Sequence, residues 1–136
     1  MRVGAGILIG CAACALAGCG TSQSDQVKAK ITQFVRAADA KDYRTLCTAV
    51  LAPSLVERLA SAGVRCSQAM QIAFQGVEDP ALSVGKVTIS GGKASAITLS
   101  TARNQQASVD TIELVRTNHG WRVSSLASPL TSSQVK

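Results

Sequence analysis

Apolar residues in the first half of the chain recur at helical spacing. One stripe follows the positions i, i+4, i+7, i+8 and i+11, and it predicts an amphipathic helix over residues 24–40 with Ser24 as its N-cap. Three short helices are expected to follow, one capped by Asp42, one opened by Pro53 and one opened by Ser67. The residues expected to face inward are Val27, Ile31, Phe34, Val35, Ala38, Tyr43, Leu46, Cys47, Val50, Leu55, Val56, Leu59, Met70, Ile72, Ala73 and Phe74.

The hydrophobic period changes to two after Pro80. Apolar and polar side chains then alternate, which is typical of strands that cover a core with one face. The alternation breaks once at Gly85-Lys86, and the pair Gly91-Gly92 fits a tight hairpin turn. The pattern predicts strands over residues 82–89, 93–101, 108–117 and 121–126.

Helices followed by a run of antiparallel strands indicate an α+β fold. A sheet of about four strands has one face that needs a cover, and the apolar stripe of the 24–40 helix supplies it. We therefore expect a single α+β domain over residues 24–136, in which N-terminal helices pack on a curved antiparallel sheet and residues 131–136 form a frayed tail.

The start of the chain has the pattern of an export signal. Met1-Arg2 give a positive start, and residues 3–17 carry no charge but are too few to cross a bilayer, which takes about 20 apolar residues. The segment ends in Leu16-Ala17-Gly18-Cys19, which resembles the lipobox of bacterial lipoproteins. The resemblance implies that residues 1–18 are a cleaved signal peptide and that Cys19 carries a diacylglyceryl group with fatty acyl chains such as palmitate.

Alternatives to this lipobox stay open. Cys11 follows Leu-Ile-Gly but has a short apolar run before it, and Cys14 lacks a leucine three residues earlier. An ordinary secretory signal cut elsewhere would leave Cys19 as a free thiol. If Cys19 is lipidated, residues 19–23 are the lipidated cysteine and a tether that reaches about 14 Å at most. The domain would then be held at the extracytoplasmic face of the cell membrane.

Two further cysteines, Cys47 and Cys66, follow the predicted signal. Outside the cytoplasm such a pair favours a disulfide, which would stabilise the fold by about 3 kcal/mol in the chain-entropy model. A metal site is disfavoured, because the sequence has 1 histidine and two thiolates do not complete a tetrahedral zinc shell. A redox pair would read Cys-x-x-Cys, which is absent. We expect neither a metal nor a cofactor.

The formal net charge is +6, of which Arg2 belongs to the predicted signal peptide. The basic side chains are scattered, without a cluster and without interleaved aromatic residues, which argues against a nucleic-acid partner. Scattered cations are typical of a solvated surface. Such a surface also suits contact with anionic lipid, where each nearby Lys or Arg contributes about 1 kcal/mol to the free energy of binding. The expected partners are membrane lipid through Cys19 and a protein or a small apolar ligand.

Residues 114–123 read Leu-Val-Arg-Thr-Asn-His-Gly-Trp-Arg-Val and look like the terminal hairpin of many exported members of the nuclear transport factor 2-like (NTF2-like, cystatin-like) superfamily. Cys47 followed by Leu51-Ala52-Pro53 also resembles small actinobacterial lipoproteins of this superfamily. The resemblance covers residues 24–128. Members of the superfamily usually insert a hairpin between the early helices, and this sequence shows none. The resemblance implies a curved sheet wrapped around a helix, often with a cavity, and it implies no chemistry.

Some members of the superfamily are isomerases or dehydratases, and such a site needs a carboxylate base in an apolar cavity and a nearby proton donor. Asp110 is the candidate base and Tyr43 the candidate donor, but Asp110 is expected near a strand end in water. His119 is expected in an exposed turn, so no catalytic residue is assigned. The candidate pocket residues are Phe34, Tyr43, Asp110, Ile112, Leu114 and Trp121.

The sequence favours a non-catalytic, membrane-anchored domain that binds a partner protein or a small apolar ligand. The alternatives are a small-molecule isomerase or dehydratase with Asp110 as base, and a structural envelope protein. An enclosed apolar cavity containing Asp110 would favour the enzyme, and an apolar cavity without a carboxylate would favour ligand carriage. A filled core with an exposed apolar patch would favour a protein partner.

Overall fold

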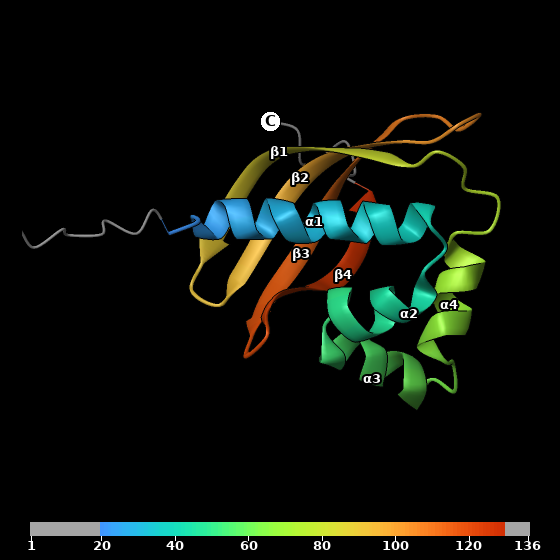
Figure 1. The fold of residues 1–136 in the computed structure, drawn as a ribbon, viewed down its shortest axis with the longest axis horizontal. Coiled ribbons are helices and arrows are strands. Elements are labelled where there is room, and N and C mark those ends of the chain that lie inside the picture. Colours follow the sequence, from blue (N-terminus) through green and yellow to red (C-terminus); the bar gives the residue numbers. More distant parts are fainter. Residues whose placement is uncertain (1–19, 130–136) are drawn as a thin grey trace, which may run out of the picture.

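The computed structural model describes residues 20–129 (Figure 1). The predicted signal peptide, Cys19 and the tail at 131–136 lie outside this range. Helices come first and strands follow, so the α+β prediction is confirmed. The elements are the helices α1 (Gln23–Asp39), α2 (Tyr43–Thr45), the π-helix η1 (Leu46–Val50), α3 (Pro53–Ser61) and α4 (Cys66–Ala73), and the strands β1 (Ala81–Ser90), β2 (Lys93–Thr101), β3 (Ser108–Thr117) and β4 (Gly120–Pro129).

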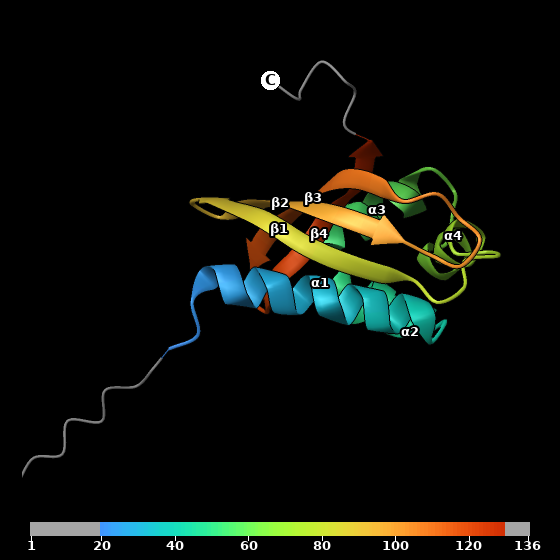
Figure 2. The same ribbon diagram turned by 90° about the horizontal axis from the view of Figure 1, so that it is seen from above.

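Helix α1 lies across one face of the sheet (Figure 2). It starts one residue before the predicted position. Ser22 caps it rather than Ser24, because the Ser22 hydroxyl oxygen accepts a hydrogen bond from the Asp25 backbone N–H at 3.1 Å. The predicted apolar stripe points into the core, where Val27 and Ile31 are buried.

The strands form one antiparallel sheet in the order β1-β2-β3-β4. The bounds of β2 and β3 are those predicted from the alternation. The register of β1 against β2 shifts between Val84 and Val87, which places a bulge at the predicted break. Ser90 pairs with Lys93 across the predicted glycine turn.

Strand β4 is longer than predicted and has a covered edge. It continues to Pro129 because its last residues still pair with β3, Pro129 lying opposite Asp110. On its other side, Leu51 pairs with Val123 in parallel, and the Ala52 backbone N–H donates to the Val123 carbonyl at 2.7 Å. The segment after η1 therefore extends the sheet by a short bridge, whereas β1, among the described residues, pairs with a strand on one side alone.

The two faces of the sheet have different surroundings. We call the face toward α1 the inner face and the opposite one the outer face. The buried residues of the inner face are Ala94, Ala96, Thr98, Asp110, Ile112, Leu114, Trp121 and Val123. The residues that alternate with them on the outer face of β2 and β3 are Ser95, Ile97, Leu99, Val109, Thr111, Glu113 and Val115.

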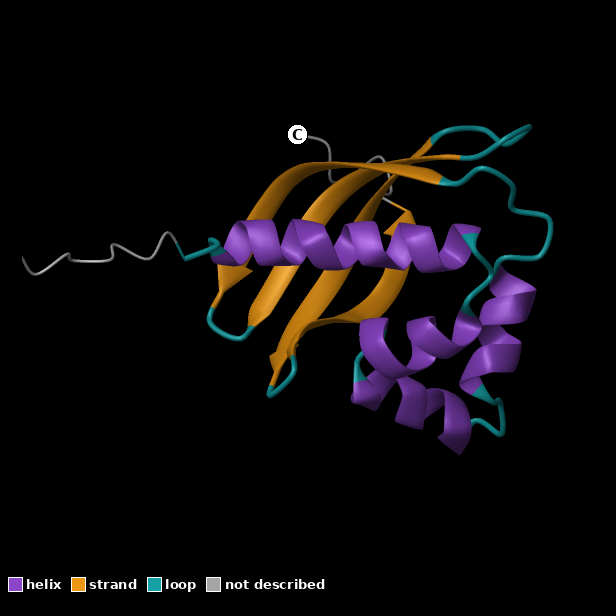
Figure 3. Ribbon diagram, viewed as in Figure 1, coloured by secondary structure: helices purple, strands orange, loops and turns teal. Residues whose placement is uncertain are grey.

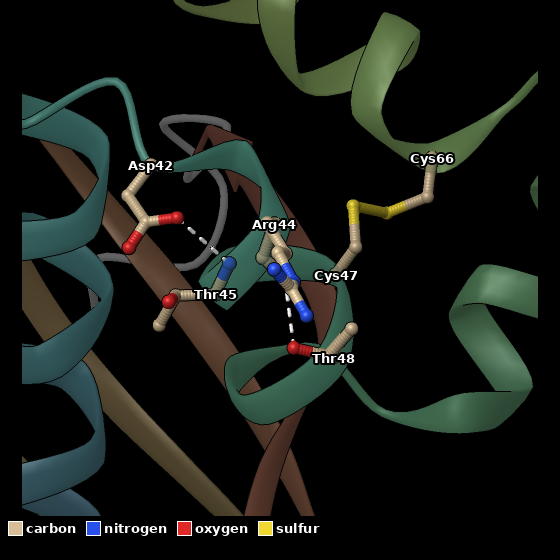
Figure 4. Close-up of a disulfide and its surroundings, with 6 residues drawn as sticks. All are labelled: Asp42, Arg44, Thr45, Cys47, Thr48 and Cys66. Carbon is tan, nitrogen blue, oxygen red and sulfur yellow. Dashed lines mark hydrogen bonds between the residues drawn. A yellow bond between two sulfur atoms is a disulfide. The ribbon is translucent and has the colours of Figure 1, made fainter.

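Helices α2, α3 and α4 gather toward the end of the molecule at which α1 finishes (Figure 3). Cys47 of η1 and Cys66 of α4 form a disulfide, with their Cα atoms 6.0 Å apart (Figure 4). The predicted pairing is confirmed, and it joins the helix before α3 to the helix after it.

Helix α4 departs from its predicted pattern. It begins at Cys66, so the expected opening residue Ser67 lies inside it, and Arg65 at the cap position makes no side-chain cap bond. Met70 is buried, but Ile72 is 63% exposed and Ala73 is exposed as well, so their inward assignments were wrong. Two residues along a helix rotate a side chain by about 200°. A short helix that buries Met70 therefore turns Ile72 toward solvent.

Asp42 caps α2 as predicted. Its carboxylate accepts a hydrogen bond from the Thr45 backbone N–H at 3.0 Å (Figure 4). Hydrogen bonding with Thr45, from its side chain and its backbone, lowers the pKa of Asp42 from its ordinary value. The charged form of this side chain is therefore the form that the fold favours.

The substitution Asp42→Asn is expected to reduce the acid sensitivity of the fold. Because the folded pKa lies below the unfolded value of about 3.9, the charged cap adds stability above that pH and loses it as the pH falls through the folded pKa. Asparagine caps helices about as well as aspartate. Urea unfolding of both proteins in neutral and acidic buffer measures the effect. The unsubstituted protein should lose more stability on acidification, and equal losses would contradict the assignment.

Candidate functional site

The space between α1 and the inner face is filled by side chains. Ile112, Leu114 and Trp121, which the sequence offered as pocket candidates, pack with Val27 and Ile31 in one buried cluster. Their role in the described part of the chain is therefore to build the core. Among residues 20–129, these side chains fill the space between this helix and the middle of the sheet.

A small hollow of about 160 Å³ remains at the end of the sheet where β2 finishes and β3 begins. Phe34 of α1 and Phe74, just after α4, line one side of it, with their rings edge to face and 5.8 Å between centroids. Ser100 and Ser108 line the side that belongs to the sheet. The hollow is thus apolar on the helical side and hydroxyl-bearing on the strand side.

Asp110 lies beside this hollow and not in water. Asp110 is 8% exposed, so the expectation that it lies in water near a strand end was wrong. The Ser108 hydroxyl donates to its Oδ2 atom at 2.7 Å and the Ser100 hydroxyl donates to the same atom at 3.3 Å. Asp110 lies on the inner face of a strand that is paired on both sides, with Thr98 of β2 and Pro129 of β4 opposite it, and two hydroxyls contact its carboxylate.

The predicted pairing of Asp110 with Tyr43 is not seen at the hollow. Neither residue is among those that line it, and the two serines stand between the hollow and the Asp110 carboxylate. Tyr43 is half-buried in α2 against the core. His119 is exposed in the turn before β4, as expected, and its backbone N–H donates to the Thr117 hydroxyl.

A much larger groove, of about 850 Å³, lies between α3 and the outer face of the sheet. The Arg58 guanidinium donates to the Ser124 carbonyl at 2.9 Å, which fixes α3 against β4. Serine and threonine hydroxyls and four charged side chains make the groove polar. Its lining includes Ser54, Glu57, Arg58 and Ser61 from α3 and Thr88, Ser90, Lys93, Ser95, Glu113, Val115, Ser124 and Ser125 from the sheet.

An exposed apolar patch continues the outer face beyond this groove. It consists of Ile97, Leu99 and Val109, which are 41%, 44% and 49% exposed. Leu99 pairs directly with Val109, and Ile97 lies two residues from groove-lining Ser95 on the same strand. Three large apolar side chains therefore form one contiguous surface, which we call the outer-face patch.

Sequence reasoning missed the groove and did not single out the patch. The available signal was the alternation within each strand, which separates Ile97 and Leu99 from the opposite face of one strand and Val109 from that of the next, but it does not join the two strands. The groove needs the position of α3 over the outer face, and no local pattern in the sequence reports that distance in space.

Two cations tie η1 to its neighbours. Lys30 of α1 donates to the Ala49 carbonyl at 3.1 Å, and Arg122 of β4 donates to the Thr48 carbonyl at 3.0 Å. Burial, followed by the charge of Arg122, lowers the pKa of Lys30. These contacts satisfy carbonyls at the end of the π-helix, so we regard both residues as structural.

The described residues hold neither a metal-binding cluster nor a membrane-spanning helix. Between residues 20 and 129, no group of three or more His, Cys, Asp and Glu side chains is arranged to hold a metal ion. None of the helices that the structure describes is long and apolar enough to span a bilayer.

Comparisons with known proteins identify the fold. No family model matches the chain, and no curated protein matches it. Among solved structures, it is similar to a candidate dehydratase of the NTF2-like family from Streptomyces avermitilis, with a TM-score of 0.54 and 18% identity over 81% of this chain and 97% of that one.

It is also similar to an NTF2-like protein of unknown function from Shewanella baltica, with a TM-score of 0.55 and 11% identity over 81% of this chain and 99% of that one. The chain therefore has the NTF2-like fold that its terminal hairpin indicated. At this level of identity the similarity extends to the fold alone.

Proposed function

We propose that this chain is a lipid-anchored domain at the extracytoplasmic face of the cell membrane, where it binds a partner protein as a non-catalytic accessory. The lipobox that ends in Cys19 supports the anchor. The disulfide between Cys47 and Cys66 supports an oxidising compartment, because such bonds are rare in the cytosol. The fold begins at Gln23, which keeps the domain close to the proposed anchor.

The observation that carries the binding role is the contrast between the two faces of the sheet. The inner face is packed by Trp121 and Leu114, and the hollow beside it in the described part of the chain, of about 160 Å³, is too small for a drug-sized ligand. The outer face exposes the outer-face patch beside a groove of about 850 Å³. Clustered apolar residues with a polar border are typical of a protein-binding surface.

A second candidate is a small-molecule isomerase or dehydratase that uses Asp110 as a base. It is favoured by the position of the Asp110 carboxylate behind two hydroxyls that line the inner hollow. One of the structurally similar proteins is described as a candidate dehydratase. For this chemistry Ser100 and Ser108 would have to turn away, so that a substrate in the hollow could reach the carboxylate.

Native mass spectrometry of the chain extracted from its own membrane tests these candidates together. We expect an acyl mass on Cys19, the loss of two hydrogens for the disulfide, and a protein that stays bound in a fixed ratio. A retained small molecule without a protein would favour the inner hollow and the enzyme. An acylated chain that retains neither would favour a structural envelope protein. A cytosolic chain that keeps residues 1–18 would overturn the proposal.

A further inference from the structure

One end of the molecule combines the start of α1 with both glycine-containing hairpin turns. The turn between β1 and β2 and the turn between β3 and β4 lie at the end at which α1 begins, in both ribbon views (Figures 1 and 2). These turns project into open space, since a Cβ atom added at Gly91, Gly92 or Gly120 would meet no other atom within 4 Å. We call this the tether end.

The tether end carries unpaired positive charge. Lys93 follows the first turn, Arg116 precedes the second, and Lys28 lies in the second turn of α1; all three are exposed. Among the described residues the ion pairs are those of Arg103 with Glu78 and Asp79, so these three cations have no carboxylate partner. Two acidic residues lie near them: Asp25, which is hydrogen-bonded to the Ser22 hydroxyl, and Glu113, which lines the outer-face groove together with Lys93 but forms no ion pair with it.

The opposite end has a different charge balance. Asp39, Asp42, Glu78 and Asp79 lie at or beyond the end of α1 or before β1, and they are interspersed with basic residues. Acidic side chains are therefore more numerous at the far end, whereas the tether end, from which the chain leads to Cys19, presents three exposed cations with Asp25 and Glu113 nearby. Only residues 20–22 separate Cys19 from α1, a reach of about 10 Å.

We propose that the tether end docks on the membrane surface itself, with Lys28, Lys93 and Arg116 against anionic lipid headgroups. In this orientation α1 begins at the membrane and its axis points away from the bilayer. This inference rests on the proposed anchor at Cys19. Each cation held near an anionic surface strengthens binding about fivefold. The docking fixes which end of the domain faces lipid and leaves the outer-face patch accessible from the side.

Lysine acetylation of the acylated protein in vesicles tests the docking. The protein is reconstituted into phosphatidylcholine vesicles with and without phosphatidylglycerol, labelled briefly, and read residue by residue by mass spectrometry. Labelling of Lys28 and Lys93 should fall about fivefold when anionic lipid is present, whereas labelling of Lys86, in the bulge of β1, should not change. Molar salt should remove the protection, because the Debye length shrinks to about 3 Å.

A pair of double variants with the same net charge provides the control. Lys93→Gln with Arg116→Gln should abolish the protection of Lys28, although Lys28 itself is intact. Arg44→Gln with Arg65→Gln removes two exposed cations far from the tether end and should leave that protection unchanged.

The possible failures can be told apart. A chain that lacks the acyl group and is not retained by vesicles would overturn the anchor and the docking with it. A chain that is acylated and retained, but whose Lys28 and Lys93 label equally in both kinds of vesicle, would overturn the docking alone.

Discussion

Replacing Cys47 and Cys66 together by alanine is expected to lower the free energy of unfolding by about 3 kcal/mol. The bridge closes a sequence separation of 19 residues, and its loss restores the conformational freedom of that loop in the unfolded chain. A loss of this size raises the unfolding equilibrium constant about 150-fold. Urea denaturation measures it as a lower midpoint.

The helical end depends on this bridge more than the rest of the molecule does. Helix α3 has no fully buried residue, and α4 buries Met70 alone. Elements with few buried contacts open first when a constraint is removed. In the double alanine variant, amide hydrogen exchange should therefore rise first in α3 and α4, while the strands keep their protection.

A matched control removes two exposed hydroxyls from the same helices. Ser54→Ala together with Ser67→Ala should change stability by no more than about 0.5 kcal/mol, because both side chains are exposed. If the cysteine variant unfolded at the same urea concentration as the oxidised protein, the structural role of the disulfide would be refuted.

The strands were predictable because their signal is local. Alternation with period two gave the bounds of β2 and β3, and the break at Gly85-Lys86 gave the bulge. Each of these features depends on neighbours in the sequence, and a one-residue error would turn every side chain to the wrong face. The α1 stripe was equally clear because it runs over several turns of one helix.

Other features depend on partners distant in the sequence, and these were missed or wrong. The burial of Asp110 depends on its place on the inner face of a strand that is paired on both sides, and the polar groove requires α3 to sit over the outer face. Ser22 and Ser24 are equally good caps by residue type, so one turn of sequence cannot choose between them. Ile72 belongs to an apolar run in α4. This helix is too short to bury every residue of the run, and Ile72 is exposed.

The double substitution Ile97→Glu with Leu99→Glu is expected to remove partner binding while the domain stays folded. Both side chains are over two-fifths exposed in the free domain and would be desolvated by a partner. Burying each apolar side chain is worth about 1.5 kcal/mol or more, and an unpaired carboxylate adds a desolvation penalty. The apparent affinity should therefore fall about 100-fold or more. A photo-crosslinker at Thr111, which pairs with Ile97 on the same face, reports the contact in native membranes.

The chain supplies its own matched control in Ile72→Glu. Ile72 is also exposed, but it lies on α4, away from the outer face, so the same chemical change there should leave the crosslinked species intact. Urea unfolding checks that the patch variant loses no more than about 1 kcal/mol of stability, as expected for exposed strand positions. If crosslinking persisted in the patch variant, the outer face would not be the binding surface. If Ile72→Glu also abolished it, binding would depend on general surface hydrophobicity and not on the arrangement of the sheet.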